Sequence, residues 1–178
     1  MKKSYYTLIL FLLILSGCNK DDDNNTVLPP ATQTGEGTFA CYVNGKPFID
    51  NSGGYFNCYY QYVDGEYYFN ISGIFENKNT PRTIALGTEG KTISEGETLQ
   101  LVDRNAGNAW AGGSFRTSEI NSAEFSFTSA ESEGELTITK LDFENRIVAG
   151  IFWFDLTNPH TGQKIEIRDG RFDTLFTQ

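Results

Sequence analysis

Apolar and polar residues alternate along most of the chain after residue 38, and short turn sequences separate the alternating stretches. A period of two is typical of β-strands that bury one face and expose the other. Two turns are especially clear, because Asn44-Gly45 and Asp64-Gly65 each lie between alternating flanks. Such dipeptides favour the two-residue turns of β-hairpins. We therefore expect one hairpin at each turn.

The Asp64-Gly65 turn also predicts the register of its hairpin, because a two-residue loop pairs Tyr62 with Tyr67. Counting back from that pair gives one apolar and one polar face, as a half-buried antiparallel pair requires. The apolar face carries Tyr62, Tyr67, Tyr60, Phe69, Cys58, Ile71, Phe56 and Gly73, and the polar face carries Gln61, Tyr68, Tyr59, Asn70, Asn57 and Ser72. In the first hairpin, the apolar face is shared by Phe39, Cys41, Val43 and Phe48.

The remaining alternation predicts further strands over residues 82–86, 98–103, 109–116, 123–128, 135–141, 146–156, 163–168 and 171–176. Residues 147–154 are apolar on both faces, which favours a central strand or one covered by a loop. Nowhere do apolar residues keep a helical period over three turns, so we expect no substantial helix. The pattern predicts an all-β fold, an antiparallel β-sandwich of roughly ten strands, with a closed lipocalin-like β-barrel as the alternative.

The tripeptide Gly-x-Phe recurs within these stretches, beginning at Gly37, Gly73, Gly113, Gly150 and Gly170. The spacing is too irregular for a repeat array. A packing role is sufficient, because a strand glycine leaves room for a neighbouring aromatic ring or marks a bulge.

The amino-terminal 17 residues have a different composition. Lys2 and Lys3 precede an apolar run over residues 8–15, and small residues precede Cys18. This order predicts a cleaved signal peptide over residues 1–17, since the run is shorter than the roughly 20 residues of a spanning helix. The sequence Leu-Ser-Gly-Cys over residues 15–18 resembles the lipobox of bacterial lipoproteins. The resemblance implies that Cys18 carries lipid chains such as palmitate and that the membrane is contacted through this anchor only.

The residues after Cys18 are similar to the export signal of Bacteroidota lipoproteins, in which Cys-x-Lys is followed by acidic residues. The matching residues are Lys20, Asp21, Asp22 and Asp23. This resemblance implies a protein of the outer membrane, lipid-anchored and facing the cell exterior. On physical grounds alone, the same residues predict an acidic tether that stays solvated.

Removal of residues 1–17 takes two of the 14 basic residues and none of the 23 acidic ones, which leaves 161 residues with a net charge of −11. Residues 18–38 have few core-forming side chains and predict a lipidated cysteine followed by a flexible tether. Residues 39–178 suit a single β-sandwich domain. The acidic balance argues against nucleic acid as a partner, since nucleic acid requires basic grooves.

Two cysteines, Cys41 and Cys58, remain in the domain, and both are expected on apolar faces. An exported chain permits a disulfide between them. Two buried thiols that act as small apolar side chains are the alternative. The sequence leaves both interpretations open.

Longer stretches of the domain are similar to uncharacterised lipoprotein families of the Bacteroidota. They are the segment FACYVNGKPF at residues 39–48 and the segments ITKLD, VAGIF and DGRFD at residues 138–142, 148–152 and 169–173. The resemblance spans most of the mature domain. Because those families are domains of unknown function, it implies the fold class and the location but no catalytic residue.

Candidate chemistry is sparse. The single histidine, His160, lies in an Asn-Pro-His-Thr-Gly sequence typical of a turn, and no Gly-x-Ser-x-Gly motif accompanies it. Residues 103–108 begin like a calcium loop, which needs an oxygen ligand at its fifth position and glycine at its sixth, but here these two residue types are exchanged. Ca²⁺ is therefore only a weak alternative to a plain turn, and no other cofactor or metal is expected. Acidic residues are plentiful, but glycoside hydrolysis needs two carboxyl groups at set distances in a cleft. We expect no enzyme.

Tyrosines crowd the second hairpin, and Tyr59 and Tyr68 lie on its polar face. A tyrosine ring can contact a sugar or a peptide, although an outward ring often only packs on its cross-strand neighbour. The sequence therefore predicts a non-catalytic binding module for a glycan or a protein, with these two rings as the nominated contacts. The alternative is a structural or accessory subunit of an outer-membrane protein complex.

Overall fold

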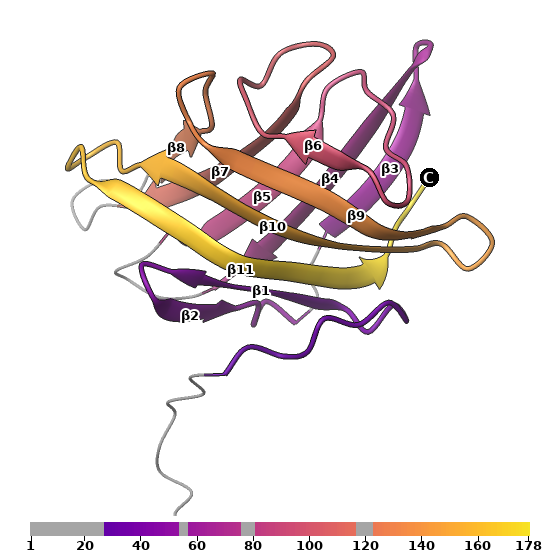
Figure 1. Ribbon diagram of the computed structural model, residues 1–178, viewed down its shortest axis with the longest axis horizontal. Coiled ribbons are helices and arrows are strands. Elements are labelled where there is room, and N and C mark those ends of the chain that lie inside the picture. The colour runs from indigo at the N-terminus through magenta and orange to yellow at the C-terminus, as the bar shows by residue number, and fades with distance from the viewer. Residues whose placement is uncertain (1–26, 54–56, 76–80, 117–122) are drawn as a thin grey trace, which may run out of the picture.

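The computed structural model describes residues 27–53, 57–75, 81–116 and 123–178, which form two antiparallel sheets packed face to face (Figure 1). The six-stranded sheet lies in front in this view, and its spatial order is β2 (Lys46–Ile49), β1 (Thr38–Val43), β11 (Lys164–Leu175), β10 (Ile147–Thr157), β9 (Gly134–Asp142) and β6 (Thr98–Gln100). The five-stranded sheet behind it has the order β3 (Asn57–Val63), β4 (Glu66–Ile74), β5 (Thr83–Thr88), β7 (Ala109–Arg116) and β8 (Ala123–Phe127).

The predicted all-β antiparallel sandwich is confirmed. The alternative of a closed barrel is wrong, because the two sheets have separate edge strands and do not pair into one cylinder. Residues from both sheets form one core, whose largest buried side chains include Phe39, Phe48, Phe69, Phe154 and Phe172. In the described part of the chain there is no helix of the length and apolarity needed to cross a membrane.

Both predicted hairpins are present with the expected registers. Tyr62 pairs with Tyr67 and Cys58 with Ile71, while Cys41 pairs with Phe48 in the first hairpin. The turn residues adopt positive φ angles, 48° at Asn44 and 51° at Asp64, as the tight turns of hairpins require. The predicted pairing of Phe56 lies outside the described residues. β10 is central in its sheet, between β11 and β9, as its apolar faces predicted.

Two strand predictions are wrong. Residues 163–168 and 171–176 were expected as separate strands, but β11 is continuous. Asp169 has a φ of 51°, and the register against β10 shifts between Phe152 and Phe154, so Asp169-Gly170 forms a β-bulge rather than a turn. The strand expected over residues 98–103 ends at Gln100, after which Leu101 makes only an isolated bridge with Ala109.

Several strand glycines make room for aromatic rings, as the Gly-x-Phe tripeptides suggested. A Cβ atom at Gly73 would overlap the ring of Phe39, and one at Gly170 would overlap the ring of Phe152. A Cβ at Gly150 would lie 2.6 Å from the ring of Phe172. The explanation does not extend to the other two tripeptides, since the Cβ position of Gly37 has no described neighbour within 4 Å and the three nearest neighbours of the Gly113 Cβ position include no aromatic ring.

The cysteines are free thiols. Cys41 lies on β1 of one sheet and Cys58 on β3 of the other, and both are buried in the core. Stacked sheets are about 10 Å apart, whereas a disulfide joins Cα atoms no more than about 7 Å apart. The disulfide considered for this pair is therefore wrong for this structure. Burial raises the pKa of each thiol well above the usual value for cysteine, so both thiols stay protonated and uncharged. Cys41 and Cys58 therefore act as small apolar side chains.

The expected flexible tether is shorter than predicted, because residues 28–36, which we call the strap, pack on the sandwich (Figure 1, indigo). Leu28 is buried, and the fully buried carboxylate of Asp173 on β11 holds the other end of the strap. Asp173 accepts hydrogen bonds from the Thr32 hydroxyl at 2.7 Å and from the backbone N–H groups of Thr34, Gly35 and Glu36 at 3.0, 2.7 and 3.2 Å.

This contact predicts an acid-sensitive strap. Burial by itself raises the pKa of Asp173, but the four hydrogen bonds to its charged form outweigh burial and hold the pKa below its usual value. The resulting stability is present above about pH 4 and is lost as the pH falls through the lowered pKa. We expect the free energies of unfolding of the wild type and of Asp173→Asn to differ clearly at pH 7 and to approach each other as the pH falls below about 4, as measured by urea denaturation. A difference that does not change with pH would contradict the ionic role of Asp173.

Candidate functional site

The outer face of the five-stranded sheet contains a shallow depression of about 250 Å³, which we call the Trp110 hollow. Side chains from all five strands and from the loop before β7 surround it. They are Asn57, Asn70, Ser72, Thr83, Ala85, Arg104, Trp110, Gly112, Gly113, Ser114, Phe125 and Phe127.

Strand register brings these residues to one face. Ser72 pairs with Asn57 on one side and with Ala85 on the other, and Gly112 continues the same row to Phe127. Directly paired residues point to the same side of a sheet. Because Ala85 is small, the middle of this row is low, and larger side chains stand around it.

The aromatic rings lie across glycines. A Cβ atom at Gly112 would lie 2.6 Å from the ring of Phe127, and one at Gly87 would lie 2.9 Å from the indole of Trp110. Phe125 and Phe127 are stacked, with ring centroids 6.2 Å apart and an interplanar angle of 12°, and they are 61% and 38% exposed. The two glycines therefore allow a flat aromatic surface to form beside the low floor.

The polar side chains of the hollow have unused hydrogen-bonding capacity. Within the described ranges, the side chains of Asn57, Asn70, Ser72, Thr83 and Ser114 make no hydrogen bond to another protein group. The Trp110 Nε1 atom is buried and likewise has no partner among the described residues. Each amide side chain can donate two hydrogen bonds and accept two, and each hydroxyl can do both.

The hollow is close to electrically neutral. Its one cationic side chain, Arg104, lies over the Trp110 ring at 4.3 Å, and its Nε donates to the Glu89 carboxylate at 2.6 Å. The ion pair balances the guanidinium charge at the rim. Neutral donors and acceptors beside an exposed aromatic surface suit an uncharged polar ligand better than an ion.

The two tyrosines nominated from the sequence lie on this face but do not line the hollow. Tyr59 is half-buried and pairs with Asn70, one of the lining residues. Tyr68 is also half-buried, and its hydroxyl donates to the Glu66 carboxylate at 3.0 Å. That hydrogen bond raises the pKa of Tyr68 and occupies the group that was expected to reach a ligand.

Other predicted site residues play different parts. Cys18, Lys20, Asp21, Asp22 and Asp23 lie outside the described residues, so lipidation and export stay predictions. Asp103 accepts hydrogen bonds at its carboxylate from the Ala130 N–H and at its backbone oxygen from the Asn108 amide, as in a plain turn. The described residues contain no group of three or more His, Cys, Asp and Glu side chains arranged to hold a metal ion. His160 lies in a turn, where its Nδ1 is 3.5 Å from Glu124.

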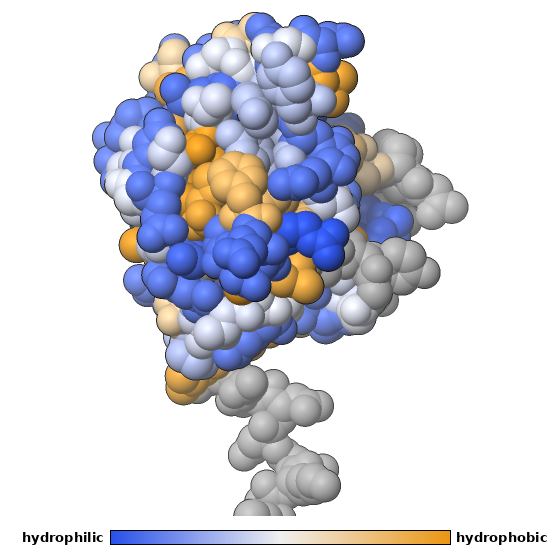
Figure 2. Space-filling model, turned by 90° about the vertical axis from the view of Figure 1, so that its right-hand side faces the viewer, coloured by the Kyte–Doolittle hydropathy of each residue, from blue (hydrophilic) through white to orange (hydrophobic). Residues whose placement is uncertain are grey.

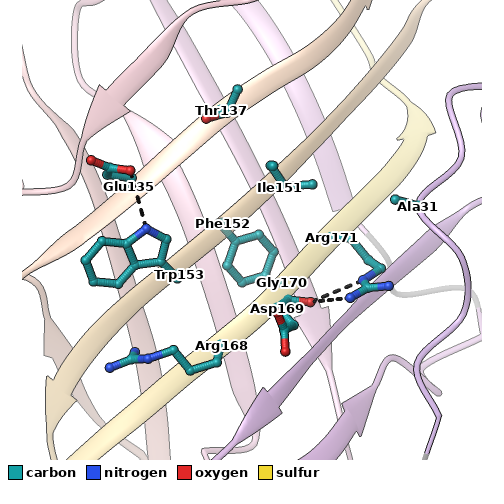
Figure 3. A pocket seen from close by; sticks show the side chains of 10 residues that line it. All are labelled: Ala31, Glu135, Thr137, Ile151, Phe152, Trp153, Arg168, Asp169, Gly170 and Arg171. Carbon is teal, nitrogen blue, oxygen red and sulfur yellow. Dashed lines mark hydrogen bonds between the residues drawn. The ribbon is translucent and has the colours of Figure 1, made fainter.

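A second depression, of about 520 Å³, lies on the outer face of the six-stranded sheet (Figure 3), and we call it the Trp153 groove. The strap forms part of its wall through Ala31. The other lining residues are Glu135, Thr137, Ile151, Phe152, Trp153, Arg168, Asp169, Gly170 and Arg171. The Trp153 Nε1 donates to Glu135 at 3.4 Å, and the Arg168 guanidinium lies 5.5 Å from the Trp153 ring.

Comparison with protein-family models, with curated proteins and with solved structures yields no match for this chain. The resemblance to lipoprotein families of the Bacteroidota therefore stays a prediction from the sequence.

Proposed function

We propose that this protein is a lipid-anchored surface lipoprotein that binds neutral sugar residues, without catalysis, in the Trp110 hollow. The observation that carries the proposal is the set of unpartnered amide and hydroxyl side chains beside the exposed Phe125–Phe127 ring pair. A neutral sugar presents hydroxyl groups around its ring and C–H groups on its faces. The sugar hydroxyls can hydrogen-bond with the amide and hydroxyl side chains, and the C–H faces can pack on the Phe125 and Phe127 rings.

The site also suits a ligand that is part of a longer chain. The hollow is shallow and open, and the small side chain of Ala85 on its floor would let a sugar ring approach the sheet closely. A free small molecule is usually held in a deeper cavity that buries most of its surface. We therefore expect oligosaccharides to bind better than monosaccharides.

The proposal includes a lipid anchor at Cys18 that holds the domain near the membrane surface. If Cys18 carries the lipid, nine residue steps separate it from Val27, where the described chain begins, and they span at most about 32 Å. The strap then fixes the domain close to the membrane surface. A glycan of the cell's surroundings or of its own envelope would be within reach.

Docking on an outer-membrane protein is a second candidate function, and an apolar patch favours it. Figure 2 shows apolar side chains gathered in the middle of one end of the sandwich, with hydrophilic side chains around them. At this end Phe143 is 52% exposed, and its ring centroid lies 5.9 Å from those of both Tyr60 and Phe176. Tyr62, on β3 near Tyr60, is 64% exposed. An accessory subunit would co-purify with an outer-membrane protein and would ignore sugars.

The test of sugar binding uses the full chain carrying Cys18→Ser, which prevents acylation. Binding of neutral oligosaccharides of glucose, mannose, xylose, galactose and N-acetylglucosamine is measured by isothermal titration calorimetry. We expect Asn57→Ala with Asn70→Ala to weaken binding at least tenfold, since each lost hydrogen bond costs about 1 kcal/mol. The melting temperature should change little, because neither side chain bonds to a described protein group.

Asn145→Ala is the matched control, because Asn145 is an exposed asparagine in the turn after β9, on the other sheet. It should leave the affinity unchanged. The proposal would be wrong if no oligosaccharide of the panel binds, or if the double substitution binds as tightly as the wild type.

A further inference from the structure

The Trp153 groove owes its charged residues to the bulge in β11. Arg168 and Arg171 are three positions apart, so a regular strand would point them to opposite faces. The extra residue at the bulge, where the register shifts against both β10 and β1, brings both side chains to the outer face. Bulges commonly redirect side chains next to functional sites.

The two arginines differ in how their charges are balanced. The Arg168 Nη2 lies 2.7 Å from the Asp155 carboxylate. Arg171 instead donates to backbone oxygens. Its Nε at 3.1 Å and Nη2 at 3.0 Å donate to Asp169 (Figure 3), and its Nη1 donates at 3.2 Å to Pro29 of the strap. Over the part of the chain that the structure describes, no carboxylate forms an ion pair with Arg171.

Arg171 is therefore a fixed cation with unused donors. Three of the five N–H groups of its guanidinium are bonded to carbonyl oxygens, which leaves two. Carbonyl groups hold the side chain in place without cancelling its charge. A guanidinium in this state is prepared to pair with a carboxylate. The Glu135 carboxylate, which also lines the groove, accepts from Gln100 at 2.9 Å and from Trp153 at 3.4 Å and forms no ion pair with Arg171 among the described residues.

The residues beside Arg171 supply an apolar floor. Ile151 pairs directly with Arg171 across β10 and β11 and is 45% exposed. Trp153 is half-buried and lies two residues beyond Ile151 on β10, so the backbone positions of these two residues are about 7 Å apart. This spacing is comparable with the size of one sugar ring that carries a carboxyl group at its edge.

We propose that the Trp153 groove binds an acidic sugar such as a hexuronic acid, with its carboxylate on Arg171 and its ring against Ile151 and Trp153. This goes beyond the proposed neutral-sugar site, since it assigns a second site, on the opposite sheet, to a different class of ligand. The two sites are independent, and neither requires the other to be occupied.

The two tryptophans of the chain make separate reporters, because one lies in each depression. In the full chain carrying Cys18→Ser and Trp110→Phe, Trp153 is the only tryptophan. We expect trigalacturonate to change its fluorescence saturably, and galactotriose, the matched neutral sugar, to do so at least tenfold more weakly. The trigalacturonate response should weaken as salt rises, because charge pairing is screened.

Arg171→Gln and Ile151→Glu test the role of the charge, and Lys46→Gln is the control. Arg171→Gln should weaken trigalacturonate binding at least tenfold, and Lys46→Gln, which removes one exposed positive charge at the first hairpin, should change it less than twofold. Ile151→Glu places a negative charge opposite Arg171 at an exposed position, so it should abolish binding without involving the strap. The melting temperature of each variant is measured in parallel.

The inference is overturned if trigalacturonate leaves Trp153 fluorescence unchanged, if galactotriose acts equally well, or if folded Ile151→Glu binds like the wild type. These results would leave the neutral-sugar proposal untouched, because that proposal depends on Asn57 and Asn70 on the other sheet.

Discussion

Replacing Asp173 with alanine is expected to lower the free energy of unfolding by about 3 kcal/mol and to release the strap from the sandwich. Asp173 is fully buried and accepts hydrogen bonds from the Thr32 hydroxyl and from three consecutive backbone N–H groups. Hydrogen bonds to a charged group contribute about 1.5–3 kcal/mol each, but the released strap regains bonds to water, so the loss is smaller than their sum. Chemical denaturation followed by circular dichroism measures the effect.

Release of the strap is measured separately, as cleavage after Glu36 by a glutamate-specific protease. Asp169→Asn is the matched control, because it removes a carboxylate from the same strand and asparagine tolerates the positive φ at this position. The protease should cleave the Asp173→Ala variant after Glu36 several times faster than it cleaves this control. Equal stability and equal cleavage of the two variants would show that the strap is held by something other than Asp173.

Replacing Gly73 with valine is expected to cost about 3 kcal/mol or more of folding free energy. Gly73 lies on β4 in the sheet-to-sheet interface, and its missing side chain is what lets the Phe39 ring of β1 lie against the β4 backbone. Phe39 is itself packed among Phe48 and Phe152, so the ring has no space into which it can move. The expected result is a clearly lower denaturation midpoint with an unchanged denaturant slope.

Gly113→Ala is the comparison, because its Cβ would lie 3.1 Å from the Leu156 Cδ1 and Pro81 Cβ atoms, and its three nearest neighbours include no aromatic ring. These contacts are relieved by shifts of a few tenths of an ångström, so this change should cost about 1 kcal/mol or less. If Gly73→Val is no more destabilising than Gly113→Ala, the contact between Gly73 and Phe39 does not set the spacing of the sheets.

Local signals in the sequence were sufficient for much of the fold. Asn44-Gly45 and Asp64-Gly65 determined two hairpins, because a two-residue turn leaves only one register in which the apolar residues share a face. The same kind of signal was misleading at Asp169-Gly170. That dipeptide also suits a β-bulge, and only its two neighbouring strands, β1 and β10, keep it within one continuous strand.

Long-range contacts decided what the sequence could not predict. The strap has the composition of a linker, and it is ordered by Asp173, which lies some 140 positions further along the chain. The Trp110 hollow likewise combines residues of β3, β4, β5, β7 and β8. The tyrosines were nominated because their hairpin had a predictable register, whereas no turn signal connects Asn70 with Trp110 or Phe127. The alternation of Phe125 and Phe127 with polar residues was the one local sign of an exposed aromatic edge.

The two depressions give the domain two faces of different chemistry. The Trp110 hollow offers neutral donors and exposed rings on one sheet, and the Trp153 groove offers a fixed arginine on the other. The strap joins the predicted anchor to the sheet of the Trp153 groove.

Nuclear magnetic resonance of the side-chain amide groups in ¹⁵N-labelled full-length Cys18→Ser protein tests whether neutral sugars bind in the Trp110 hollow. On titration with the tightest-binding neutral oligosaccharide, the side-chain NH₂ signals of Asn57 and Asn70 should shift progressively and saturate, whereas that of Asn145 should not move. Saturable binding that shifts the signals of neither Asn57 nor Asn70 would place the sugar elsewhere on the protein and would rule out the Trp110 hollow as the neutral-sugar site.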